Sequence, residues 1–279
     1  MQSNYHSHCS FCDGSAPMED FVRAAVERNI KYYGFSSHSP VPFDNDWSMK
    51  MEMLDEYRQE FFRLKEKYET EINLSLGMEV DFISNVTGAN DEYIRSRKWD
   101  YLISSIHHLE QFANGEFWNI DHTFAIFKDG VDDIFGGDIS VATKAFYRST
   151  CEMIELGGFD IIGHVDKITM NGRKIAGFDL SLKWYDDLIQ EVFRLLAEKE
   201  IMVEINTKIF SATGITFPDI RYFKQLHQLN IPVTVNSDCH SPEKITDGFP
   251  EVYKLLKENG FKTTRLLIGG RWEDVPIVI

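Results

Sequence analysis

Asn4-Tyr5-His6-Ser7-His8 is the most informative stretch of this chain, and Asp13 follows shortly after it. Alternate side chains of a β-strand point to the same face, so a strand here would present the imidazoles of His6 and His8 to one side. Histidines and carboxylates recur at intervals from this stretch to the end of the chain. We therefore expect His6 and His8 to begin a metal site.

Strand-like and helix-like patterns alternate along the rest of the chain. Besides the first strand, β-prone runs occupy residues 32–36, 72–81, 101–107, 160–163, 201–206, 232–236 and 263–268. Helical patterns occupy residues 17–28, 48–69, 139–155, 182–199, 218–229 and 242–259. Pro17 suits a first helical turn and Ser48 suits an N-cap. This alternation is typical of βα units around a parallel sheet.

The segment 112–137 is irregular and rich in Phe, Asp and Gly, so we expect an elaborated loop with a short helix there. No repeat, low-complexity stretch or linker divides the chain. We predict one α/β domain over residues 1–279. A barrel is favoured, because metal-competent residues follow many different strands and the carboxyl ends of barrel strands open onto one face.

Charge and composition narrow the class of protein. The 279 residues are 43% hydrophobic and 26% charged, with a net charge of -15. Nucleic acids and anionic membranes need cationic surfaces, so we expect neither as a partner. An anionic substrate stays compatible with this charge, because a bound divalent cation can dominate the local field.

The compartment is predicted from signals that the sequence lacks. The start of the chain has neither a basic n-region nor an apolar h-region, and no apolar run is long enough to span a bilayer. The four cysteines make no disulfide framework for a chain of this length. We expect a cytoplasmic, reduced protein.

The metal-competent residues follow the predicted strands. His6 and His8 lie on the first strand and Asp13 in the loop after it. The others lie in or just after later strands, and they are His38, Glu79, His107, His164, Asp238 and His240. A single histidine at a strand end is more often a satisfied polar residue than a ligand. Six of nine histidines in such places are hard to explain by accident. Mixed imidazole and carboxylate ligands suit Zn²⁺, Mn²⁺ or Fe²⁺.

Three histidines fit this pattern less well. His108 follows a candidate ligand directly, and adjacent strand residues point opposite ways, so it either leans into the mouth of the pocket or packs behind it. His122 lies in the irregular segment, where a contact with substrate and a surface position are both open. His227 is expected on the surface of a helix.

Other catalytic patterns are weak or missing. Cys9 and Cys12 form a Cys-x-x-Cys pair, but no second pair accompanies them and they do not start a helix after a central strand, so redox chemistry is not expected. The sequence has no Gly-x-Gly-x-x-Gly or Walker-type loop and no Gly-x-Ser-x-Gly elbow. Nucleotide-cofactor chemistry and serine hydrolysis are therefore not supported.

Together these motifs resemble the PHP (polymerase and histidinol phosphatase) superfamily, and among its members the monofunctional histidinol-phosphate phosphatases. The resemblance covers nearly the whole chain. The motifs that carry it are His6-Ser7-His8 with Asp13-Gly14, Ser37-His38-Ser39-Pro40, Gly77-Met78-Glu79-Val80-Asp81, Ser105-Ile106-His107, 159–166, Val203-Glu204-Ile205-Asn206-Thr207 and Asn236-Ser237-Asp238-Cys239-His240.

The resemblance implies a distorted (β/α)7 barrel with two or three divalent ions. By motif, a first ion would be held by His6, His8, Glu79 and Asp238. A second would share Glu79 and add His107 and His164, and a third would take Asp13, His38 and His240. The chain departs from the family pattern at Asn4, where an acidic residue often stands, and in the residues that follow His164.

The resemblance further implies a phosphoric monoester hydrolase of histidine biosynthesis that acts on L-histidinol phosphate. Two ions bridged by Glu79 would lower the pKa of a bound water, supplying hydroxide near neutral pH. Lys167 or Arg173 is a candidate to hold the phosphate, and His108 to touch the substrate. No general acid is identifiable and the oligomeric state stays open. The alternatives are another PHP phosphoesterase acting on nucleotides or other small monoesters, and a metal-dependent amidohydrolase.

Overall fold

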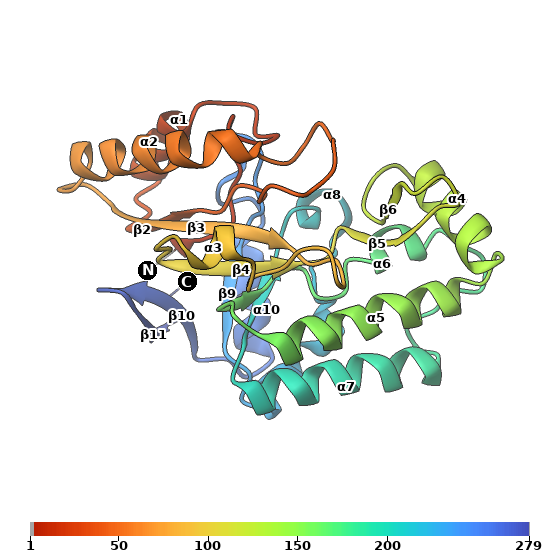
Figure 1. Ribbon diagram of the computed structural model, residues 1–279. Coiled ribbons are helices and arrows are strands. Elements are labelled where there is room, and N and C mark those ends of the chain that lie inside the picture. Colours follow the sequence, from red (N-terminus) through yellow and green to blue (C-terminus); the bar gives the residue numbers. More distant parts are fainter. Residues whose placement is uncertain (1–2, 279) are drawn as a thin grey trace.

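Seven parallel strands form the centre of the molecule in a computed structural model that describes residues 3–278 (Figure 1). They lie in the order in which they follow one another along the chain: β1 (Ser3–Asn4), β2 (Tyr32–Phe35), β3 (Asn73–Asp81), β4 (Tyr101–Ser105), β7 (Ile161–Ile162), β8 (Met202–Asn206) and β9 (Val233–Asn236). The backbone N–H of His8 donates to the carbonyl of Cys239, 2.9 Å away, so the first and last strands meet. The expected (β/α)7 barrel is confirmed.

Helices cover the barrel: six of those named here correspond to the predicted helical runs, and three short ones of four residues each were not predicted. They are α1 (Met18–Glu27), α2 (Leu54–Lys67), α3 (Glu92–Arg95), α5 (Ile139–Leu156), α6 (Thr169–Gly172), α7 (Lys183–Lys199), α8 (Phe210–Thr213), α9 (Phe223–Gln228) and α10 (Phe249–Glu258), with short 3₁₀ turns η1 (Met51–Met53), η2 (Ile220–Tyr222) and η3 (Pro242–Lys244). In α2 the buried side chains are Leu54, Tyr57, Phe61 and Leu64, which recur at helical spacing. None of the helices within residues 3–278 is long and apolar enough to cross a membrane.

The start of α2 differs from the prediction. Ser48 is not its N-cap, because the helix begins at Leu54 after the 3₁₀ turn η1. The backbone N–H of Ser48 donates instead to the side-chain oxygen of Asn45, 2.7 Å away. Ser48 therefore belongs to the loop that precedes the helix.

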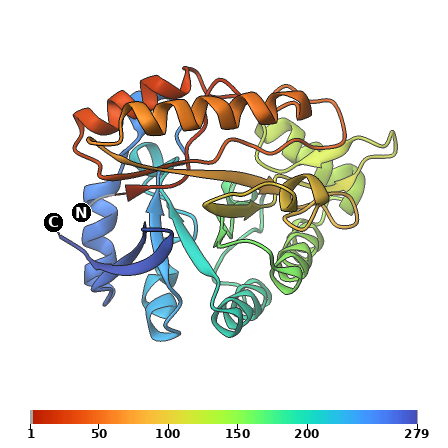
Figure 2. The same ribbon diagram turned by 60° about the vertical axis from the view of Figure 1, so that its left-hand side comes forward.

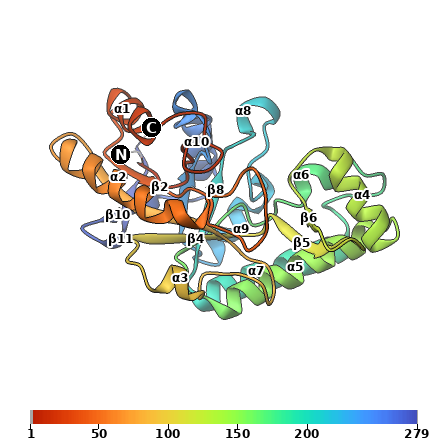
Figure 3. The ribbon, with the colours of Figure 1, turned by 45° about the horizontal axis from the view of Figure 1, so that its top comes forward.

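The irregular segment is more ordered than expected. It contains a hairpin of β5 (His108–Gln111) and β6 (Phe117–Asn119), followed by the twelve-residue helix α4 (Phe124–Phe135). The prediction of a short helix was wrong in length: Thr123 caps α4 at its start and buried Phe127 and Val131 anchor it. In Figure 3 this hairpin and α4 extend beyond the end of β4.

The last predicted strand lies outside the barrel. β10 (Thr263–Ile268) pairs antiparallel with β11 (Arg271–Pro276), a strand that the pattern did not predict (Figure 2). Leu267 of this hairpin packs in one buried cluster with Tyr5, Tyr101, Ile103, Ile161 and Met202, at the amino ends of the barrel strands. The backbone N–H of Leu267 also donates to the Tyr5 hydroxyl, 2.8 Å away. The hairpin therefore closes the amino end of the barrel, and the carboxyl end remains for the site.

Candidate metal centre

The nine predicted metal ligands lie at the carboxyl end of the barrel. Glu79 lies within β3, and the other eight lie in the segments that follow β1, β2, β4, β7 and β9. The strand assignment of His6 and His8 was wrong, since β1 ends at Asn4 and only an isolated bridge between Ser7 and Cys239 continues the pairing. Short strands thus leave the ligand-bearing segments free to turn inward.

Glu79 is the centre of the group. Its carboxylate is 1% exposed, and five imidazole rings approach its two oxygens. The nitrogen–oxygen distances are 2.9 Å for His38, 3.0 Å for His164, 3.1 Å for His6, 3.4 Å for His107 and 3.5 Å for His8. One carboxylate therefore contacts side chains from four different strand ends.

Three overlapping sets of these residues place their donor atoms within 4.8 Å of one another. The sets are His6, His8 and Asp238; His38, Glu79 and His107; and His8, Asp13, His38 and His240. This grouping differs from the expected one, because His38 appears in two sets and His164 in none. His164 still reaches the group, since its Nε2 atom lies 3.2 Å from Nε2 of His107.

The donor atoms fit divalent ions better than they fit one another. Among residues 3–278, the buried atoms His6 Nε2, His8 Nε2 and Glu79 Oε2 have no hydrogen-bond partner, although oppositely charged groups lie close. A buried polar atom left in this way costs about 1–3 kcal/mol, and coordination to a metal would satisfy it. Imidazole and carboxylate donors without thiolates suit Zn²⁺, Mn²⁺ or Fe²⁺.

Two further carboxylates contact the Nδ1 atoms of histidine rings whose Nε2 atoms face Glu79. The Glu204 carboxylate lies 2.6 Å from Nδ1 of His6, and the Asp81 carboxylate lies 3.3 Å from Nδ1 of His107. The contact at His6 is a hydrogen bond, and such a bond fixes the orientation of a ligating imidazole and increases its basicity. Neither role was predicted. For Glu204 the available signal was a charged residue alternating with Asn206 inside an otherwise apolar strand.

The charges of the cluster are strongly coupled. Burial alone would raise the pKa of Glu79, but the neighbouring rings of His6, His107 and His38 bring that pKa well below its usual value. Burial alone would lower the pKa of His6, yet the carboxylates of Glu204 and Glu79 raise it well above its usual value. The carboxylates are therefore ionised and available as ligands.

Two of the predicted ligands have unusual backbone conformations. His164 has φ +22° and Asp238 has φ +48°, in the left-handed region that side chains other than glycine rarely adopt. Such conformations persist where the surrounding structure enforces them, and they concentrate at functional sites. Both residues turn sharply inward just after a strand ends.

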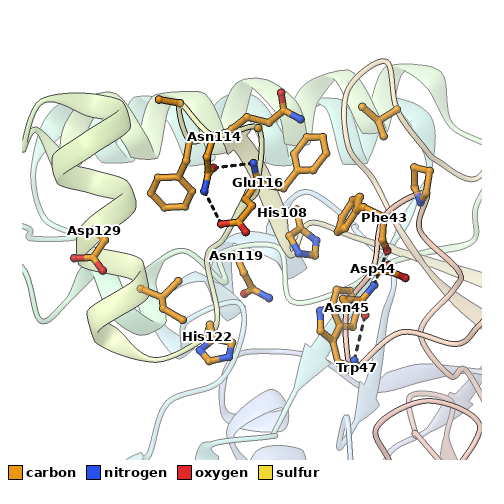
Figure 4. A pocket seen from close by; sticks show the side chains of 18 of the residues that line it. Phe43, Asp44, Asn45, Trp47, His108, Asn114, Glu116, Asn119, His122 and Asp129 are labelled. Atoms are coloured by element: carbon orange, nitrogen blue, oxygen red, sulfur yellow. Dashed lines mark hydrogen bonds between the residues drawn. The ribbon is translucent and has the colours of Figure 1, made fainter.

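The three predicted substrate-binding residues each have a different carboxylate as partner. Lys167 is buried, with its ammonium 3.4 Å from the carboxylate of Asp121. The guanidinium of Arg173 forms an ion pair with the carboxylate of Asp219, with 2.5 Å between nitrogen and oxygen. His108 is buried beside Asp81, and of the two positions left open for it, it occupies the wall of a pocket (Figure 4). The other two uncommitted histidines are exposed: His122 lines the same pocket and His227 lies on α9.

One cation was missed. Lys208 lies in the segment directly after β8. Its ammonium is 3.0 Å from Oδ1 of Asp238. Burial would lower the pKa of Lys208, but Asp238 and Asp121 raise it, so the ammonium stays charged. Its position after a barrel strand was the only signal in the sequence, because lysine in a loop is ordinarily a surface residue.

The Cys-x-x-Cys pair lies beside the cluster. Cys9 is buried, and burial raises the pKa of its thiol to about 11. Cys12 Sγ lies 3.6 Å from Nδ1 of His8. A thiol with a raised pKa is a poor nucleophile and a poor metal ligand, because the thiolate performs both roles.

Comparison with known proteins identifies the family of the chain. The family model described as PHP domain matches residues 4–208, which contain seven of the nine predicted ligands. The chain belongs to the PHP domain family. This confirms the resemblance seen in the sequence motifs.

Relatives of this PHP chain extend over nearly its full length. A probable histidinol-phosphatase of Deinococcus radiodurans is 24% identical over 266 residues, covering 92% of this chain and 94% of the relative. A histidinol-phosphatase of Lactococcus lactis is 24% identical over 265 residues, covering 92% of this chain and 90% of the relative.

Two solved structures have the same fold. A candidate histidinol phosphatase from Listeria monocytogenes aligns with TM-score 0.77 and 22% identity, over 90% of this chain and 99% of that one. Histidinol phosphate phosphatase from Lactococcus lactis, in complex with zinc, L-histidinol and phosphate, aligns with TM-score 0.73 and 21% identity, over 98% of each chain.

Proposed function

We propose that this PHP chain is a metal-dependent histidinol-phosphatase, which hydrolyses L-histidinol phosphate to L-histidinol and phosphate. The observation that carries the proposal is the convergence of five imidazoles on the buried Glu79 carboxylate at the open end of the barrel. The names of the curated relatives and the ligands in the Lactococcus lactis structure support this choice of substrate. The route would be biosynthetic and, as expected from the sequence, cytoplasmic.

Two or three divalent ions would be held by the nine clustered residues, with zinc, manganese or iron as the candidates. When bound, such ions neutralise phosphate oxygens and activate water for attack on phosphorus. Glu79 is placed to serve more than one ion, because His6, His8 and His38 meet one of its oxygens while His107 and His164 meet the other. Glu204 would keep the ring of His6 in its ligating orientation.

Lys208 is the cation best placed to help bind the phosphate. Its ammonium lines a pocket of about 300 Å³ together with Asp13, Asp238 and His240 of the cluster. An ammonium there would share its hydrogen bonds between Asp238 and a phosphate oxygen. Lys167 is a second candidate because it lies in the same charged surroundings, whereas Arg173 is already paired with Asp219.

A small-molecule substrate also agrees with the charge of the chain. The net charge of -15 disfavours polyanionic partners such as long nucleic acids. A small monoester needs only local cations, which bound ions and Lys208 would supply. The proposal includes one domain that spans residues 1–279.

A phosphate-release screen tests the function. Purified protein with added Zn²⁺ or Mn²⁺ is offered L-histidinol phosphate, nucleoside monophosphates, phosphotyrosine and glycerol phosphate. We expect the highest kcat/KM for L-histidinol phosphate. A higher kcat/KM for a nucleoside monophosphate would reassign the chain to another PHP phosphoesterase, and absence of release from every ester would reject a phosphatase.

A further inference from the structure

The barrel has a seam, the boundary between β1 and β9, that differs from its other strand boundaries. The six neighbouring strand pairs are parallel and share a backbone register, whereas within residues 3–278 β1 and β9 are not paired as strands. One isolated bridge, between Ser7 and Cys239, joins the segments that follow the two strands. Side chains therefore have to hold the strands themselves together.

Asn4 lies on β1, reaches across this seam and is fully buried. Its Oδ1 atom accepts the backbone N–H groups of His6 and Ser237, each at 3.2 Å. Its Nδ2 atom donates to Oγ of Ser237 at 2.7 Å and to the carbonyl of Ile245 at 3.1 Å. The amide thus uses both lone pairs of its oxygen and both of its hydrogens.

The partners of Asn4 include the backbone on both sides of a pair of predicted ligands. Ser237 and Ile245 lie before and after Asp238 in the last metal-binding motif, and the third bonded group is the N–H of His6 itself. Across the seam, Nε2 of His6 lies 3.8 Å from Oδ1 of Asp238, within one of the sets of converging donors. A single side chain therefore holds the backbone from which both ligands project.

A second asparagine makes the reciprocal contact. Asn236, on β9, is fully buried, and its Oδ1 atom accepts the backbone N–H of Tyr5 at 2.8 Å. Its Nδ2 atom donates at 3.0 Å to Oε1 of Glu204, the oxygen that lies 2.6 Å from Nδ1 of His6. The backbone beside each strand thus bonds to a side chain of the other, and the two amides take the place of the missing backbone pairing.

The surroundings of Asn4 match an amide and not a carboxylate. Two backbone N–H groups face its oxygen and a backbone carbonyl faces its nitrogen, which fixes the orientation of the amide. An ionised carboxylate would keep the bonds from His6 and Ser237 but would set an oxygen about 3.1 Å from the carbonyl oxygen of Ile245, with no hydrogen between them. Buried acceptors that face one another are destabilising. The departure from the family pattern at residue 4 thus has a structural reason.

We propose that Asn4 is a positioning residue of the metal centre: together with Asn236 it closes the barrel seam through side-chain hydrogen bonds and sets the spacing between His6 and Asp238. The inference rests on the proposed function, because this spacing matters for the ions that the function requires. Asn4 acts through the backbone of His6 and Ser237 and not by contact with an ion.

The test is a Co²⁺ titration of metal-free protein, followed by the visible absorption of the bound ion. Asn4→Asp keeps the size of the side chain and removes both donor hydrogens. We expect it to weaken Co²⁺ binding by about 10- to 100-fold and to alter the absorption spectrum, because the residues that orient metal ligands have effects of this size.

The matched control is Asn259→Asp, at a half-buried amide that ends α10. Its Nδ2 atom also donates to a backbone carbonyl, that of Leu255 at 2.8 Å, so the same substitution again sets a carboxylate against a carbonyl oxygen. Asn259 has no contact with the predicted ligands. This variant should keep the wild-type Co²⁺ affinity and spectrum even if it loses stability.

A milder variant covers the case in which Asn4→Asp fails to fold. Ser237→Ala removes the hydroxyl that accepts from Nδ2 of Asn4 and keeps the backbone bond between the two residues. It is expected to weaken Co²⁺ binding by about 2- to 10-fold, the size of one hydrogen bond. Circular dichroism verifies that each variant is folded.

The outcomes separate this inference from the proposed function. Wild-type affinity and spectrum in folded Asn4→Asp would overturn the inference, and so would an equal loss of affinity in Asn259→Asp or a wild-type protein that binds no Co²⁺. If Asn4→Asp does not fold, unchanged affinity in Ser237→Ala would overturn it. Absence of phosphate release from L-histidinol phosphate by the metal-loaded wild type would reject the proposed function, whatever the Co²⁺ affinities of the variants.

Discussion

At the residue scale, Glu79 is the central side chain of the cluster, because its two carboxylate oxygens meet imidazoles from both sides. A carboxylate that serves several ions is harder to replace than a single imidazole. Its amide analogue keeps the size of the side chain and removes the charge. The consequence should appear both in bound metal and in turnover.

We predict that Glu79→Gln lowers kcat/KM for phosphate release by more than about 100-fold and lowers the metal content per chain. Elemental analysis and a phosphate assay on the same preparation measure both. The matched control is Glu71→Gln, an exposed residue before β3, which should change neither. Full metal content with full activity in Glu79→Gln would refute the assigned bridging position.

Lys208 carries a second prediction at this scale. Lys208→Met should lower kcat/KM by about 10- to 100-fold and weaken inhibition by inorganic phosphate, because a charge-assisted hydrogen bond is lost. Steady-state kinetics with added phosphate measure both effects. Lys262→Met, at an exposed position far along the chain, is the control. Unaltered phosphate inhibition in Lys208→Met would assign the phosphate contact elsewhere.

The sequence predicts the candidate metal ligands better than the residues that contact those ligands. Glu79 and the histidines stand out because they recur at strand ends in residue types that bind metals. Glu204 and Lys208 were not assigned a role, since their importance depends on which neighbour each one reaches in space. His108 was left with two possible orientations, which only the position of Asp81 resolves.

At the scale of elements, β8 shows how a strand builds the site. Alternation along β8 points Glu204 and Asn206 to the same side, and the amide of Asn206 donates both to Glu204 at 3.0 Å and to Asp238 at 3.1 Å. Glu204 thus connects the strand to the ring of His6. Its proposed role is to orient the ring of His6 as a metal ligand.

Glu204→Gln should therefore weaken metal binding about 10- to 100-fold while the fold is retained. Competition with a chelating dye measures the affinity, and circular dichroism monitors the fold. Glu155→Gln, an exposed glutamate at the end of α5, provides the comparison. Equal metal affinity in the two variants would argue against the orienting role.

The β10–β11 hairpin shows where periodicity reaches its limit. The run 263–268 was correctly predicted as a strand, but its pattern does not specify whether the strand joins the barrel or covers its end. Tyr5 and Tyr101, whose rings lie 5.5 Å apart at the amino end, provide the surface that the hairpin covers. That surface exists only after distant segments have come together.

Leu267→Ala should destabilise the protein by about 2–5 kcal/mol, because Leu267 is buried in this cluster. Urea unfolding followed by fluorescence measures the change. Leu156→Ala removes the same atoms at a position 58% exposed and should cost less than about 0.5 kcal/mol. Because the hairpin lies opposite the site, folded Leu267→Ala should keep its turnover, and similar stability losses in both variants would contradict a closing role.

At the scale of the whole molecule, barrel closure is what makes separate motifs into one site. The contact between His8 and Cys239 joins segments more than two hundred residues apart, and it brings the first motif beside the last. The alternation of strands and helices predicted this topology in outline. The β5–β6 hairpin and α4 line the pocket that contains His108. Neither the hairpin nor the full length of α4 was predicted, because the composition of this segment is irregular.

We propose that metal bound at this cluster drives the hydrolysis of L-histidinol phosphate. The most direct measurement is a metal titration of chelator-treated protein, with phosphate release from L-histidinol phosphate measured at each step. We predict no release from the metal-free protein and recovery that saturates at two or three equivalents of Zn²⁺ or Mn²⁺ per chain. Full activity without metal, or no release at saturating metal, would contradict a metal-dependent hydrolysis.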